Sequence, residues 1–166
     1  MTPQRVVILR HAEKPAEDGN PHLSAAGQAR ADMLAQLIPR QFPNPDFLFA
    51  AAPSTGSNRC LETLLPLSKA LGLPVNGIFA DGDFVQLADD LLTRPAYDRK
   101  GIIICWHHGK IPELAVALGV QPAQLEGLAG MIGQHWDPAV FDRFWVLDFA
   151  PTVGVAFASA VQTSSP

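Results

Sequence analysis

The strand that decides the fold lies within residues 5–15, which read Arg-Val-Val-Ile-Leu-Arg-His-Ala-Glu-Lys-Pro. Residues 6–9 form an unbroken, β-branched-rich apolar run, which predicts a strand buried on both faces. This strand cannot continue through Arg10 and His11 without burying charge, so we expect the pair where the strand opens into a loop. Ligands bind at the carboxyl ends of strands in open α/β sheets. The pair therefore suits a phosphate site, in which arginine holds oxygens and neutral histidine attacks phosphorus, or else a solvated strand end.

The composition of the chain excludes several function classes. Its 166 residues are 48% hydrophobic and 17% charged, with a net charge of −4 and no basic run, which argues against nucleic-acid binding. No secretory leader and no membrane-spanning run is visible. Cys60 and Cys105 are expected to be reduced, buried thiols, so a cytoplasmic protein is expected. We predict one domain over residues 1–166, with a frayed tail over 160–166.

Strand and helix patterns alternate along the rest of the chain, which predicts a three-layer α/β/α sandwich with a mostly parallel central sheet. Ser24 is placed to cap the first helix. Gly127 to Gln134 is glycine-rich and is predicted to be a loop. The expected strands after the first are 47–51, 75–79, 101–106, 144–149 and 153–157, and the expected helices are 24–38, 57–71, 84–92 and 111–118, with a helical turn at 122–125.

Two further strand ends carry groups that suit phosphate. Arg59 falls in the first turn of the helix after strand 47–51, where a cation is unfavourable against the helix dipole and a bound phosphate would relieve the cost. The alternative is an ion pair with Glu62 on a solvated face. The strand at 101–106 ends in His107 and His108. In a parallel sheet these ends meet Arg10 and His11 at one edge, and this convergence favours a functional site.

Four motifs in order make the chain resemble the histidine phosphatase superfamily, which has the phosphoglycerate mutase-like fold. The resemblance extends from about Val6 to Phe157. It rests on the Arg-His signature in residues 9–14, the helix-opening segment 23–31, the second-arginine segment 57–63, and the strand end 106–111 with its histidine. Because the chain has little room for the insertions that enclose a sugar phosphate in mutases, the resemblance implies a small phosphatase.

The resemblance also implies roles for individual residues. His11 matches the nucleophile that becomes a phosphohistidine, with a backbone carbonyl expected to fix its tautomer. Arg10 and Arg59 match the two arginines that hold the phosphoryl oxygens. His108 matches the second histidine, because glycine commonly follows it, as Gly109 does here. His107 is the competing assignment, and alternation along a strand would let only one of the two face the pocket.

The family's proton donor is usually an acid between the second arginine and the second histidine. Asp83 is preferred here, because it follows the third strand and a glycine turn. Glu13, close to His11 in sequence, is the alternative donor. Other acids in this segment are Asp81, Asp89 and Asp90.

The sequence thus predicts a metal-independent phosphatase that acts on a phosphorylated small molecule or a phosphoprotein, without a cofactor. The alternative is a catalytically silent phosphate-binding module with the same fold. A metal site built from His11, His22, His107, His108 and His135 lacks the spacing that metal ligands require.

Overall fold

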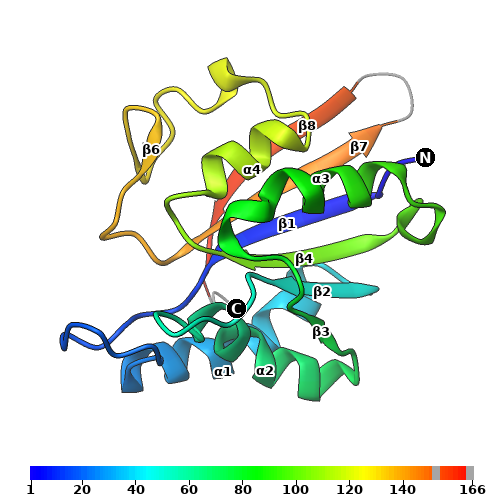
Figure 1. Ribbon diagram of the computed structural model, residues 1–166. Coiled ribbons are helices and arrows are strands. Elements are labelled where there is room, and N and C mark those ends of the chain that lie inside the picture. Colours follow the sequence, from blue (N-terminus) through cyan, green and yellow to red (C-terminus); the bar gives the residue numbers. More distant parts are fainter. Residues whose placement is uncertain (151–153, 164–166) are drawn as a thin grey trace.

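A six-stranded sheet forms the centre of the protein, in a computed structural model that describes residues 1–150 and 154–163 (Figure 1). Its strand order is β3-β2-β4-β1-β7-β8. The first strand, β1 (Arg5–Arg10), pairs in parallel with β4 (Gly101–Trp106), and β4 pairs in parallel with β2 (Phe47–Ala50). The short β3 (Val75–Asn76) continues the parallel half beside β2.

An antiparallel hairpin completes the sheet on the other side of β1. Strand β7 (Arg143–Ala150) runs antiparallel to β1, and β8 (Gly154–Val161) runs antiparallel to β7. Strand β8 therefore points in the same direction as β1. Its carboxyl end reaches the same edge of the sheet as the carboxyl ends of β1, β2 and β4.

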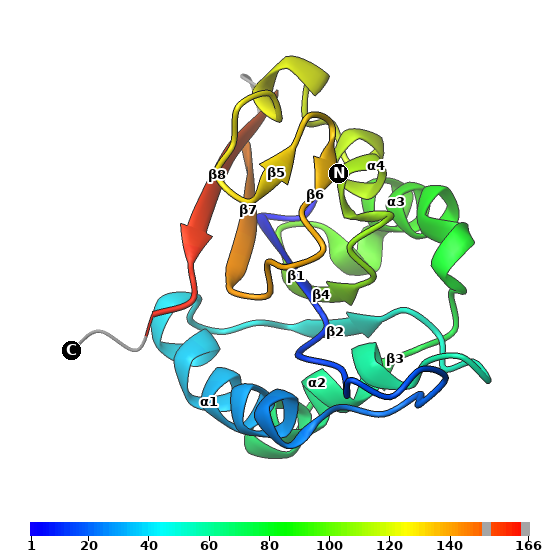
Figure 2. The ribbon, with the colours of Figure 1, turned by 90° about the vertical axis from the view of Figure 1, so that its left-hand side faces the viewer.

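Helices cover both faces of the sheet (Figure 2). Helices α1 (Ala25–Gln41) and α2 (Arg59–Leu71) pack together on one face, and α3 (Phe84–Thr93) and α4 (Ile111–Ala117) pack together on the other. Val6, Val7, Ile8 and Leu9 of β1 are completely buried between these layers. The predicted sandwich is confirmed. Short 3-10 turns lie at Asp81–Asp83, Pro95–Tyr97 and Pro122–Gln124.

Helix α1 begins as predicted but runs further than expected. The hydroxyl of Ser24 accepts a hydrogen bond from the backbone N–H of Gly27 at 3.0 Å, which caps the helix. The helix ends at Gln41, beyond the predicted end at residue 38, and it includes Pro39. A proline near the end of a helix removes only one backbone donor. The N–H of Phe42 still donates to the carbonyl of Ile38 at 2.7 Å, so the last turn is kept.

The loop predicted at 127–134 is confirmed for 127–130 and 133–134, but residues 131–132 form one strand of a small hairpin that was not predicted. Strand β5 (Met131–Ile132) pairs with β6 (His135–Trp136) in antiparallel register. Trp136 is 2% exposed, lies 5.1 Å from the Trp145 ring and donates its indole N–H to the carbonyl of Val140. These contacts with residues outside the hairpin hold it in place, and the local glycines could not reveal them.

The end of the chain is more ordered than predicted. Strand β8 continues to Val161, and Gln162 is 6% exposed, with its backbone N–H donating to the carbonyl of Asp142. The prediction of a frayed tail from residue 160 is therefore wrong for 160–162. Residues 160 and 161 pair with β7, and Gln162 donates to the carbonyl of Asp142, just before β7. The expectation for 164–166, and that for residue 153, fall outside the described residues. The predicted third strand, 75–79, is shortened to β3.

None of the helices in the described part of the chain has the length and apolar character that a bilayer crossing requires.

Candidate active site

Three strand ends meet at one edge of the sheet and bring the predicted phosphate-binding residues together. The backbone N–H of His11 donates to the carbonyl of Trp106 at 3.2 Å, which ties the ends of β1 and β4. Arg59 begins α2, directly after the loop that follows β2. The charges of Arg10 and Arg59 both lower the pKa of His11, so both guanidinium groups lie within electrostatic reach of its ring.

Arg10 is a buried cation held by the chain before β7. It is 2% exposed, and its Nη1 donates to the carbonyls of Pro138 at 2.7 Å and Val140 at 3.0 Å. The guanidinium carbon lies 3.7 Å from the centre of the Phe141 ring. Burial, and next the charge of Arg59, lower the pKa of Arg10 to about 10, so it remains a cation at neutral pH.

His11 is buried, neutral and has a defined tautomer. It is 3% exposed, and burial, supported by the nearby cations, lowers its pKa to about 3. Its Nδ1 lies 2.7 Å from the carbonyl oxygen of Ala12. A carbonyl can only accept, so Nδ1 carries the proton and Nε2 keeps a free lone pair. The imidazole is thus prepared as a nucleophile at any pH above its own pKa.

Arg59 does not form the ion pair with Glu62 that was the alternative to phosphate binding. Its Nη1 donates to the carbonyl of Asn20 at 2.8 Å. Glu62 instead accepts from His22 and from the backbone N–H of Leu23. Among the described residues, the buried Nε atoms of Arg59 and Arg10 have no hydrogen-bond partner. A buried donor without a partner is costly, and the oxygens of a bound anion would satisfy both.

Thr63 joins the two halves of the site, and the sequence analysis did not assign it a role. This completely buried hydroxyl accepts from the backbone N–H of Ala12 at 2.9 Å and donates to the carbonyl of Arg59 at 2.7 Å. It therefore fixes the loop that carries His11 against the helix that carries Arg59. The second-arginine segment 57–63 ends in Glu62 and Thr63, and this pair was the available signal.

Both histidines after β4 lie near the site, in different surroundings. The ring of His107 lies 5.3 Å from that of His11, edge to face. Burial opposes protonation of His107, but contacts with Cys60 and the charge of Asp81 together raise its pKa. Cys60 is buried against both His107 and Cys105.

His108 lies on the side of Arg10. Burial, then the charges of Arg10, His107 and Lys14, lower its pKa to about 4. It also borders a cavity of about 540 Å³. The other residues around this cavity are Gly109, Lys110, Pro112, Glu113, Gln134, His135, Trp136 and Pro138.

The acids considered as proton donors differ in what they contact. Asp83 accepts a hydrogen bond from the backbone N–H of Ala80 at 3.1 Å, so its carboxylate caps the 3-10 turn. Asp81 lies near His107, has a buried Oδ1 without a partner among the described residues, and has its pKa raised by burial. Glu13 is bound to Arg30, with Oε1 2.6 Å from Nη2. Burial would raise the pKa of Glu13, but its hydrogen bonds, chiefly to Arg30, lower it.

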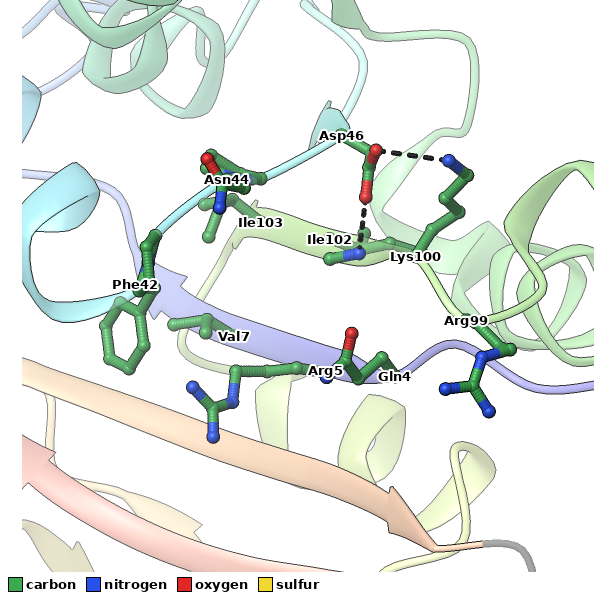
Figure 3. Close-up of a pocket in the computed structure, with 13 residues that line it drawn as sticks. Gln4, Arg5, Val7, Phe42, Asn44, Asp46, Arg99, Lys100, Ile102 and Ile103 are labelled. Atoms are coloured by element: carbon green, nitrogen blue, oxygen red, sulfur yellow. Dashed lines mark hydrogen bonds and ion pairs between the residues drawn. The ribbon is translucent and has the colours of Figure 1, made fainter.

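A second cavity, of about 470 Å³, lies at the opposite edge of the sheet (Figure 3). Several of its charged groups are paired: Lys100 pairs with Asp46 at 3.3 Å, and Arg5 pairs with Asp148 at 2.6 Å. Arg99 also lines the cavity. It lies at the amino ends of β1 and β4, away from His11. These ion pairs stabilise the fold, and the cavity contains none of the predicted site residues.

Within residues 1–150 and 154–163, no group of three or more histidine, cysteine, aspartate and glutamate side chains is arranged to hold a metal ion.

No protein-family model matches the sequence, and no curated protein matches it either. Solved structures do match over nearly the whole chain. The protein histidine phosphatase SixA, in complex with tungstate, aligns with a TM-score of 0.61 and 15% identity, covering 95% of this chain and 97% of that chain. The chain has the histidine phosphatase fold. Two further solved structures with the same fold also align with this chain.

A mycobacterial glucosyl-3-phosphoglycerate phosphatase, in complex with inorganic phosphate, aligns with a TM-score of 0.56 and 16% identity over 98% of both chains. Phosphoglycerate mutase from Plasmodium falciparum aligns with a TM-score of 0.56 and 14% identity, covering 93% of this chain and 87% of that chain. The predicted phosphoglycerate mutase-like fold is therefore confirmed.

Proposed function

We propose that this protein is a phosphatase that acts through a covalent phosphohistidine on His11. The observation that carries the proposal is the state of His11, a buried, neutral imidazole whose Nδ1 is committed to Ala12 while its Nε2 is free. Arg10 and Arg59 hold the phosphoryl oxygens, and their buried Nε donors support this role. The two neighbours named as phosphatases above have structures with tungstate and with phosphate, both tetrahedral oxyanions.

The reaction has two displacements at phosphorus. Nε2 of His11 attacks the phosphorus atom, the bond from phosphorus to the leaving oxygen breaks, and that oxygen takes a proton from the acid. Water then attacks the phosphohistidine, the P–N bond breaks, and the deprotonated acid accepts the proton of the water. Phosphoryl transfer requires mainly positioning and stabilisation of charge, which the two arginines supply.

His108 contributes to binding the phosphoryl group from the side of Arg10. It is neutral at physiological pH because its pKa is lowered to about 4, so it donates one ring N–H to an oxygen of the phosphoryl group. His107 is the second candidate for this role, since its ring lies beside that of His11. His107→Ala and His108→Ala decide between the two candidates. The variant that removes the phosphoryl contact is expected to lower kcat by about 100-fold or more.

Asp81 is the proton donor that the site supports best, in place of Asp83. Its raised pKa keeps more of the carboxyl protonated, as a donor requires, whereas Asp83 caps a turn. Asp81→Asn is expected to slow hydrolysis of an alkyl phosphate at least about 10-fold more than that of an aryl phosphate, because only the poor leaving group needs the proton. Asp83→Asn serves as the matched control, since its amide oxygen can still accept from Ala80. A selective loss in Asp83→Asn would reverse the assignment.

The substrate class is a phosphorylated small molecule or a phosphoprotein. The cavity beside His108 is a suitable place for the leaving group, and Lys110, Glu113, Gln134 and His135 give it polar walls. The indole of Trp136 is nearly fully buried and offers no exposed aromatic surface there. A leaving group that forms hydrogen bonds therefore fits this cavity better than a flat apolar one.

Hydrolysis of p-nitrophenyl phosphate in the presence of EDTA tests the proposal, with vanadate as the inhibitor. His11→Ala is expected to abolish turnover and also the acid-labile phosphoryl label on the protein. Arg94→Ala, at an exposed arginine directly after α3, is the control that retains the wild-type rate. Turnover that survives in His11→Ala would refute the nucleophile. Phosphate binding without turnover between about pH 4 and about pH 8 would favour the silent module.

A further inference from the structure

The side chain of Glu13 belongs to a partly buried hydrogen-bond network. It follows His11 by two positions, yet its carboxylate is fully engaged by one guanidinium group. Arg30 Nε donates to Oε1 at 2.9 Å and to Oε2 at 3.0 Å, and Nη2 donates to Oε1 at 2.6 Å. The two side chains are only 26% and 22% exposed. This two-pronged geometry fixes orientation as well as distance.

The other edge of the Arg30 guanidinium reaches the last strand of the sheet. Its Nη1 donates to Oε1 of Gln162 at 3.3 Å, and Nε2 of Gln162 donates to the carbonyl of Arg143 at 3.1 Å. Gln162 follows the carboxyl end of β8, which reaches the catalytic edge because β8 runs in the same direction as β1. A buried glutamine therefore connects the β7–β8 hairpin to Arg30, and Arg30 connects to Glu13.

The backbone of Glu13 is held by the same helix that presents Arg30. Its carbonyl accepts from the N–H of Ser24 at 2.9 Å and from the Ser24 hydroxyl at 3.2 Å. Gly27 allows this close approach, since a Cβ there would lie 2.3 Å from the carbonyl oxygen of Glu13. Ala12, directly after His11, is anchored through Thr63, and Glu13 is anchored to α1 and its cap through both its backbone and its side chain.

We propose that Glu13, Arg30 and Gln162 form a positioning chain that holds the His11 loop closed over the sheet edge. The inference rests on the proposed function, and it gives Glu13 a role other than proton donation. A carboxylate bound to a guanidinium on both oxygens has no proton to give. What it supplies is a fixed loop, which keeps His11 out of water and keeps Nε2 aimed at the phosphorus atom. Small displacements of a nucleophile are costly to the rate.

Glu13→Gln and Arg30→Ala test the chain with two readouts. Each is expected to lower kcat by about 10- to 100-fold, by the same factor for an aryl and an alkyl phosphate, and the double variant is expected to be no slower than the worse single variant. A loosened loop admits water to His11, so its pKa, followed by NMR titration of the ring, should rise from about 3 toward about 6.5. Arg30→Lys should restore the rate only in part.

The controls separate positioning from folding and from catalysis. Arg94→Ala breaks the exposed ion pair with Asp90 and should leave both the rate and the His11 pKa unchanged. Gln162→Ala removes only the far end of the chain and should shift both readouts in the same direction by a smaller amount. It applies the same test if Arg30→Ala does not fold.

An unchanged His11 pKa in folded Glu13→Gln would overturn the positioning chain. A loss confined to the alkyl phosphate would also overturn it and return Glu13 to the role of donor. Both results leave the proposed function intact, because that depends on His11→Ala. The NMR readout needs no turnover, so it decides the inference even if the phosphatase proposal fails.

Discussion

Thr63 shows how one buried hydroxyl holds two segments of the proposed site in place relative to each other. It uses both its donor and its acceptor capacity, toward the carbonyl of Arg59 and from the N–H of Ala12. The oxygen lies in a completely buried position, so water cannot replace it easily. The loop that carries His11, the proposed nucleophile, and the start of α2 at Arg59 are thereby tied through one atom, although they are far apart in sequence.

Replacing Thr63 by valine should therefore damage both stability and activity. The variant keeps the shape but leaves the Ala12 N–H without a partner, which costs about 1–3 kcal/mol in the free energy of unfolding. We also expect kcat to fall by about 10-fold or more because the His11 loop is released. Urea denaturation and steady-state kinetics measure the two effects.

Thr93→Val is the matched control for this change. Thr93 also donates to the carbonyl four residues before it, at 2.7 Å, but it is exposed and holds no loop. Its replacement should change stability by less than about 0.5 kcal/mol and leave kcat unchanged. Equal effects of the two substitutions would contradict the role given to Thr63.

At the residue scale, charge next to an apolar run was the informative signal. Arg10 and His11 were singled out because charged groups at the end of a buried strand need a reason to be there. Arg59 was singled out because a cation in the first turn of a helix is unfavourable against the helix dipole. Alternation of side chains along a strand could not decide between His107 and His108, because β4 ends at Trp106 and both histidines lie beyond it. Asp81 was not preferred over Asp83, since burial of a carboxylate depends on neighbours that the local sequence does not name.

The contact between helix α1 and the loop after β1 is set by Gly27. This glycine lies inside the helix, where alanine would ordinarily be about 1 kcal/mol more favourable. Here a Cβ would collide with backbone, at 2.3 Å from the carbonyl oxygen and 3.0 Å from the nitrogen of Glu13. Backbone cannot move aside as a flexible side chain can. The close packing of α1 against the backbone of Glu13 therefore requires glycine at position 27.

Gly27→Ala should reverse the usual stabilising effect of alanine in a helix. We expect a loss of at least about 1–3 kcal/mol in the free energy of unfolding, as for an overpacked site, together with lower kcat. Gly56→Ala is the control, because its nearest neighbouring atom would lie at 3.9 Å. Thermal and urea denaturation of both variants test the expectation. A more stable Gly27→Ala variant would show that the loop can yield.

At the scale of elements, periodicity and capping residues predicted the helices and strands that pack through continuous apolar faces. Ser24 marked the start of α1 correctly, but Pro39 did not mark its end, because the last turn keeps the bond from Phe42 to Ile38. The β5–β6 hairpin was missed, because its stability comes from Trp136 packing on Trp145 and not from local propensity.

The stability of the whole molecule should decrease in acid because His11 is buried in its neutral form. The unfolded chain binds a proton at this histidine below about pH 6.5, whereas the folded protein does so only near a pKa of about 3. The stabilisation is therefore complete above the higher value and decreases as the pH falls through this window. One such proton contributes a slope of about 1.4 kcal/mol per pH unit.

His11→Asn should reduce that slope by about one proton between about pH 6 and about pH 4. Asparagine can still donate to the carbonyl of Ala12, so the variant changes titration more than packing. Urea denaturation at several pH values provides the free energies, and the curves of variant and wild type should run parallel above about pH 7.5. Equal slopes at low pH would mean that His11 is protonated in the folded protein.

The two buried cysteines allow the rate at which the protein opens locally to be measured. Cys60 is 2% exposed and Cys105 is completely buried, and burial raises the pKa of the Cys60 thiol. Cys60 lies on α2 and Cys105 on β4, so reagents that alkylate thiolates have access only when α2 separates from β4. The rate of alkylation therefore reports how often α2 detaches from the sheet, and the measurement needs no substrate and no substitution in the chain.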